Sequence, residues 1–202
     1  MEAEELFLPF ALPKERVPLV SAVRSTVIIS SLTGLRAAGR YDEYLAKLER
    51  RFHDVVASPN PNAWLPLDFA LAHYDACQRL DLEPAMIDEI GAQSGRFVNE
   101  TLLSVLTRVS KEFGVTPWFA LSNSNTLGAR TWMGGSFAVW KLGPKEARLE
   151  WIQQPVARFP YFRRAFGGFT KAICGHFARA MFVSELPMPN KATEIAYRLS
   201  WV

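Results

Sequence analysis

The hydrophobic pattern changes from a helical period to a strand period near residue 131. Before it, apolar residues recur every three or four positions with charges between them, which is typical of amphipathic helices. This spacing predicts three helices, over residues 42–56, 65–82 and about 94–113, and a shorter helix after Pro117. The β-branched run from Ser25 to Ile29 fits either a short strand or the start of a helix.

After residue 131, apolar and polar positions alternate. Residues 137–142 and 147–151 therefore form a predicted hairpin around the turn at 143–145, and residues 180–186 and 193–201 form another. A helix over 159–177 lies between the hairpins. These elements predict an α+β fold, in which a helical N-terminal half packs on a four-stranded antiparallel sheet with hairpin–helix–hairpin order.

Prolines separate the start of the chain from the rest. Pro9, Pro13 and Pro18 disfavour helix at the residues before them, so residues 1–19 are predicted to form an extended arm. The chain has 202 residues, and a length near 150 per domain is usual. We therefore expect one α+β domain over residues 20–202.

Charge and composition exclude several classes of protein. The formal net charge of +3 is spread along the chain, without the basic stripe or reading motif of a nucleic-acid-binding protein. No apolar run reaches the ~18 residues of a membrane span, and the acidic Met1 to Glu5 is unlike a secretory signal. Two cysteines do not make a disulfide framework. A cytoplasmic location is expected.

Residues with catalytic or metal-binding chemistry are sparse. His53, His73 and His176 are far apart, and no metal-ligand spacing occurs, so no metal site is predicted. Cys174 and His176 are close in sequence, but side chains two apart on a helix diverge. An enzyme using this pair in a pocket of scattered residues is the alternative hypothesis, because sequence patterns would miss such a pocket.

The segment from Arg158 to Lys171 is rich in cations and aromatic rings, with no acidic residue until Glu185. Cations near a helix start oppose the helix dipole, and an anionic ligand or partner would offset their field. A solvated basic face beside an aromatic core explains the same pattern. The candidate site for a ligand or partner consists of Arg158, Tyr161, Arg163, Arg164 and Lys171.

The order of elements, with Gly167-Gly168 in the late helix and a last strand ending at Trp201, resembles a family of uncharacterised bacterial proteins of about this size. The residues that carry this resemblance are Trp64-Leu65-Pro66, Ile90-Gly91-Ala92, Pro155, Gly167-Gly168 and Ser200-Trp201. More remotely, the layout is similar to the superfamily of haem-nitric-oxide-binding domains, 4-vinyl-reductase-type sensors and TRAPP vesicle-tethering subunits. This resemblance implies a ligand pocket between helices and sheet.

The sequence departs from the haem-binding members of that superfamily. Those members use a proximal histidine, whereas residues 91–113 contain none, and no tyrosine here begins their Tyr-x-Ser-x-Arg motif. No cofactor is therefore expected, and haem gas sensing is the less favoured alternative. The leading hypothesis is a non-catalytic binding or signalling module, acting through a protein partner or an apolar small-molecule pocket. A homodimer is left open.

Overall fold

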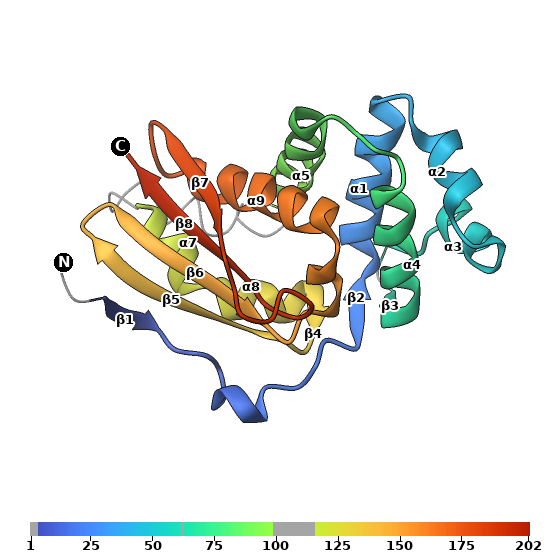
Figure 1. The fold of residues 1–202 in the computed structure, drawn as a ribbon. Coiled ribbons are helices and arrows are strands. Elements are labelled where there is room, and N and C mark those ends of the chain that lie inside the picture. The colour runs from blue at the N-terminus through green and yellow to red at the C-terminus, as the bar shows by residue number, and fades with distance from the viewer. Residues whose placement is uncertain (1–3, 62, 99–115) are drawn as a thin grey trace.

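The computed structural model describes residues 4–61, 63–98 and 116–202 (Figure 1). Its strands form two antiparallel sheets, one of five strands in the order β1-β5-β6-β8-β7 and one of three in the order β3-β2-β4. The strands of the larger sheet are β1 (Glu5–Leu8), β5 (Ser136–Gly143), β6 (Glu146–Ile152), β7 (Met181–Leu186) and β8 (Ile195–Trp201). Those of the smaller sheet are β2 (Ala22–Arg24), β3 (Trp64–Pro66) and β4 (Trp132–Met133).

Helices make up the rest of the regular structure. The α-helices are α1 (Ser25–Ala37), α2 (Tyr41–Lys47), α3 (His53–Ala57), α4 (Leu67–Gln78), α5 (Pro84–Val98), α7 (Pro117–Ser122), α8 (Ser124–Thr131) and α9 (Pro160–Gly175). Short 3-10 helices are η1 (Lys14–Arg16), η2 (Arg50–Phe52) and η4 (Pro155–Arg158). The predicted α+β class with an antiparallel sheet is confirmed, as are both hairpins and the helix between them.

The larger sheet has one strand more than the predicted four. The extra strand, β1, comes from the proline-rich N-terminal segment, where Glu5 pairs with Lys141 and Leu6 with Trp140. Residues 5–8 precede the first proline, so every one of them keeps its backbone N–H for pairing. The arm thus supplies an edge strand.

The helices on the larger sheet are mainly α7, α8 and α9, and not those of the N-terminal half as predicted. Helix α8 packs on β5, and α9 packs on β7 and β8. In Figure 1, α1 to α4 lie at one end of the molecule and the sheet at the other, with α5 and α9 between them. Helix α1 packs on α5, and α4 packs on α9 and β2.

Two glycines bring α5 and α9 unusually close. A Cβ atom built at Gly91 would lie 1.9 Å from the Ala165 carbonyl oxygen, and one at Gly168 would lie 2.3 Å from the Asp88 carbonyl oxygen. Glycine in a helix interior costs about 1 kcal/mol relative to alanine. Here the close approach of the two backbones explains why glycine is present in spite of that cost.

In three segments the observed secondary structure differs from the prediction or decides between its alternatives. Residues 25–29 are helical, as the start of α1, and the strand β2 precedes them. The helix predicted over 42–56 is interrupted at Leu48, whose ψ of 141° is extended, giving α2 and α3. Helix α5 is described as far as Val98, and most of the helix predicted over 94–113 lies outside the described residues.

The apolar side chains form a hydrophobic core that extends from the N-terminal helices to the sheet. Trp151, Ile28 and Leu199 are among its fully buried members. Among the described residues, no helix combines the length and the apolar character that a bilayer crossing requires.

Candidate functional site

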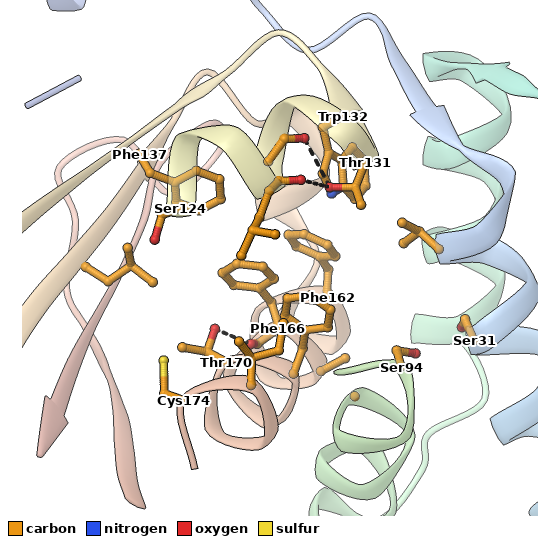
Figure 2. Close-up of a pocket in the computed structure, with 18 of the residues that line it drawn as sticks. Ser31, Ser94, Ser124, Thr131, Trp132, Phe137, Phe162, Phe166, Thr170 and Cys174 are labelled. Carbon is orange, nitrogen blue, oxygen red and sulfur yellow. Dashed lines mark hydrogen bonds between the residues drawn. The ribbon is translucent and has the colours of Figure 1, made fainter. Parts of the chain in front are cut away.

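A cavity of about 110 Å³ lies inside the core, between α5, α8, α9 and the larger sheet. Figure 2 shows Phe162, Phe166 and Thr170 rising from α9 on one side, with Ser124 and Thr131 on α8 opposite. Ser94 of α5 and Ser31 of α1 also contribute to the wall. The cavity thus lies at the junction of the two ends of the molecule.

Aromatic rings keep the cavity from closing. Phe162 and Phe166 are four residues apart on α9, and their rings stack with centroids 5.9 Å apart. Phe166 also stacks on Phe169, at 5.5 Å, and on Phe137 of β5, at 6.2 Å. The other walls carry small side chains, such as Gly91 and Ser124. Rigid rings facing small residues leave a volume that neither side fills.

Most hydroxyl groups on the wall already have partners. Ser94 donates to the Ile90 carbonyl at 3.2 Å, and Thr170 donates to the Phe166 carbonyl at 2.8 Å. Each hydroxyl therefore turns back onto its own helix. Tyr161 differs, because its buried hydroxyl lies beside the Ser31 hydroxyl and the Cys77 thiol without a hydrogen bond of full geometry in the described residues. Satisfying that hydroxyl would lower the cost of its burial.

A buried polar cluster lies behind this wall. His73 Nδ1 is 2.8 Å from the Tyr44 hydroxyl, and His73 Nε2 is 3.1 Å from the Ser31 hydroxyl and 3.7 Å from the Cys77 sulfur. Burial without a neighbouring anion lowers the pKa of His73 to about 3, so its ring is neutral near pH 7. Burial raises the pKa of Cys77 and of Tyr44. The cluster carries no charge.

Cys174 and His176 lie on opposite sides of α9. Cys174 is buried on the cavity wall, where desolvation raises the pKa of its thiol to about 12. His176 is exposed at the end of the helix, and its ring packs on Phe177. The structure therefore does not bring the two together as nucleophile and base, and the thiol stays protonated near pH 7.

The five residues of the predicted charged site are divided between three places. Arg163, Arg164 and Lys171 line an open groove beside α9. Tyr161 is inside the core and faces the cavity. Arg158 donates to the Pro155 carbonyl within η4 and lines neither the groove nor the cavity. The sequence pattern thus combined two distinct regions.

Haem does not fit the residues around the cavity. None of the three histidines lines it, and among residues 4–61, 63–98 and 116–202 no arginine or lysine does so to pair with propionates. Cys174, Tyr74 and Tyr161 are possible iron ligands by type, but burial away from cations keeps all three protonated. Its volume of about 110 Å³ is also below the roughly 300–1,000 Å³ of pockets for drug-sized ligands. Among the described residues, no group of three acidic, histidine or cysteine side chains could hold a metal ion.

Solved structures of haem-nitric-oxide/oxygen-binding (H-NOX) domains share this α+β fold. An unliganded Fe(II) H-NOX protein variant from K. algicida matches with a TM-score of 0.66 and 9% identity, over 89% of this chain and 96% of that one. An oxygen-binding H-NOX domain related to soluble guanylate cyclases matches with a TM-score of 0.60 and 12% identity, over 88% and 94%. At these identities, the likeness establishes the fold.

Comparisons by sequence give no match. No family model matches this chain, and no curated protein matches it either. The structural likeness agrees with the haem-nitric-oxide-binding part of the resemblance described above. The similarities to 4-vinyl-reductase-type sensors and to TRAPP subunits stay predictions.

Apart from Tyr161 and Cys174, the cavity residues were not found from the sequence. Phe162, Phe166 and Phe169 read as ordinary core aromatics, and small residues such as Ser94 and Ser124 carry no chemical signal of their own. The available signal was the glycine positions, Gly91 and Gly168, where close approach of another backbone has been found.

Proposed function

We propose that this chain is a non-catalytic binding module whose cavity takes a small apolar ligand of about the size of benzene. The observation that supports this most is the aromatic-lined cavity of about 110 Å³ in an otherwise closely packed core. Voids larger than a water molecule are few in protein interiors, and each costs stability. An apolar cavity of roughly 150 Å³ binds benzene or xenon.

The Tyr161 hydroxyl gives the ligand a polar feature to recognise. Tyr161 lies on the cavity wall, and its buried hydroxyl is beside Ser31 and Cys77 without a hydrogen bond of full geometry among the described residues. A ligand that presents one acceptor, such as phenol, would take a hydrogen bond from it, worth about 1 kcal/mol net. We therefore infer that a monocyclic aromatic molecule with one polar substituent is preferred over a pure hydrocarbon.

A change in ligand occupancy would be signalled through the helices around the cavity. The H-NOX structures include an oxygen complex, so proteins of this fold can hold a small ligand. Here we propose a regulatory role for a smaller ligand that binds without haem. A protein partner would then respond to the change in these helices, as the hypothesis of a signalling module requires.

Calorimetric titration with benzene, phenol and indole tests the proposal. Ser124 points to the cavity and has no hydrogen bond in the described residues, so Ser124→Phe fills the space without removing one. We expect Ser124→Phe to abolish binding and Ser124→Ala, its matched control, to keep it. Tyr161→Phe should reduce the preference for phenol over benzene by about tenfold or less.

Two results would contradict the proposal. The first is equal binding by Ser124→Phe and Ser124→Ala, since binding would then lie outside the cavity. The second is stoichiometric uptake of haem with a Soret absorbance band, because the donor set described above would then hold a macrocycle after all.

A further inference from the structure

The groove beside α9 is independent of the cavity and of the function proposed for it. It is open, has a volume of about 930 Å³, and is lined by α5, α9 and β7. Helix α9 separates the two sites, with Phe162 and Cys174 on the cavity side and Arg164 and Lys171 on the groove side.

The groove carries an excess of positive charge. Among the residues that the structure describes, its lining has five cationic side chains and three carboxylates. Each carboxylate bonds to an arginine: Glu89 to Arg96, Asp88 to Arg164 at 2.6 Å, and Glu185 to Arg163 at 2.8 Å. Lys171 and Arg179, both exposed, have no ion-pair partner among the described residues. These two positive charges in the groove are therefore available to pair with an anionic group of another molecule.

The wall opposite α9 is the free edge of a sheet. Strand β7 is the outermost strand of the five, beyond β8. Ala180 and Val202 exchange both backbone hydrogen bonds, at 3.4 and 3.2 Å, so alternate residues from Ala180 onward bond to β8. The N–H and C=O groups of Met181, Val183 and Glu185 point the other way. In the described part of the chain, no backbone group pairs with them.

We propose that this groove binds an extended, acidic segment of a partner protein. The segment adds as a strand to the free edge of β7, and its alternate side chains place carboxylates against Lys171 and Arg179. Strand addition explains affinity through backbone hydrogen bonds, and charge explains specificity. The glycines and alanine of the floor, Gly167, Gly175 and Ala172, leave room for a chain close to α9.

Fluorescence anisotropy with an eight-residue peptide that alternates threonine and glutamate tests the charge requirement. Lys171→Glu with Arg179→Glu should weaken binding at least tenfold. Arg130→Glu with Lys191→Glu makes the same change in net charge at exposed positions outside the groove, and should change binding less than twofold. A peptide with glutamine in place of glutamate should bind at least tenfold more weakly.

A second pair of variants tests the strand. Val183→Pro removes an N–H on the free edge while keeping the bonds to β8, since proline is tolerated on edge strands where the N–H faces outward. It should weaken peptide binding at least tenfold, whereas Val183→Thr should stay within twofold. Hydrogen exchange on the unaltered protein gives an independent readout, because the peptide should slow exchange at Val183 and Glu185.

The proposal is overturned if the glutamine peptide binds as well as the glutamate peptide, or if exchange at Val183 and Glu185 is unchanged by bound peptide. It is also overturned if Lys171 and Arg179 hold the protein on phosphatidylserine vesicles and no peptide binds, which would assign the groove to a membrane surface.

Discussion

The two sides of α9 show how one helix serves two environments. Toward the cavity it presents stacked phenylalanine rings and no charge, whereas toward the groove it presents arginine, lysine and glycine. The cavity side is held by the packing of apolar side chains, while the groove side is open and held by ion pairs. Changes on the first side should therefore act on stability, and changes on the second on binding and salt dependence.

The largest effect is expected from Phe162→Ala. Phe162 is 3% exposed and contacts Tyr74, Trp132, Trp151 and Phe166. Its truncation enlarges the cavity and should lower the free energy of unfolding by about 3–5 kcal/mol, measured by urea denaturation. Phe182→Ala is the matched control, because Phe182 is 60% exposed, and it should cost less than about 0.5 kcal/mol. Equal losses would show that α9 does not form a packed wall.

Gly91→Ala should break the wall that both sides share. The new Cβ would lie 1.9 Å from the Ala165 carbonyl oxygen, so α5 and α9 must separate. Overpacking outweighs the gain in helix propensity, and we expect a net loss of about 2 kcal/mol in urea denaturation. At Gly175 the nearest atom is 3.5 Å away, so Gly175→Ala should be close to neutral. A neutral Gly91→Ala would contradict the close crossing.

Acid should act on the interior through His73. Burial lowers the pKa of His73 from its ordinary value to about 3. Below about pH 6.5, the unfolded chain therefore binds a proton at this residue that the folded chain does not bind. Stability is thus lost as pH falls from about 6.5 toward 3, by about 2 kcal/mol between pH 7 and pH 5 from this group. The groups that face it, Tyr44, Tyr74 and Cys77, stay neutral in that range.

The difference between His73→Gln and the unaltered protein isolates this contribution. Urea denaturation at both pH values should show a smaller loss for His73→Gln. An unchanged slope in His73→Gln would mean that the imidazole can be protonated in the folded chain.

The smallest effect is expected from the exposed ion pairs of the groove. In a double-mutant cycle of Arg164→Ala and Asp88→Ala, the coupling energy should be below about 1 kcal/mol and should fall in 1 M salt. Arg163→Ala should cost more, because the Arg163 guanidinium is largely buried and also donates to the Ala157 carbonyl at 2.8 Å. A coupling above about 2 kcal/mol for the Arg164 pair would contradict the contrast drawn here.

What the sequence predicted depends on whether the signal is local. The hairpins and α9 follow from alternation and helical spacing, which the chain carries within a few residues. The strand β1 depends on partners far away in the sequence, since it forms by pairing with Lys141 and Trp140. Local patterns cannot show such partners.

The same reason separates the two sites. Arg163, Arg164 and Lys171 lie close together in the sequence, so their segment was predicted, although Tyr161 belongs to the cavity and Arg158 to neither site. The cavity is a volume between side chains from α1, α5, α8, α9 and β5. An empty volume has no residue of its own, and only the folded arrangement defines it.

The two edges of the five-stranded sheet are unequal. β1 has four residues, is interrupted by a bulge between Leu6 and Leu8, and is followed by Pro9, all of which oppose further pairing. β7 has six residues and a regular pairing with β8. Edge-to-edge polymerisation needs two edges on every molecule that can pair with another strand. Here only β7 can do so, and growth by edge pairing therefore ends after a single addition. Association through this sheet is self-limiting, and it favours a discrete complex over a fibril.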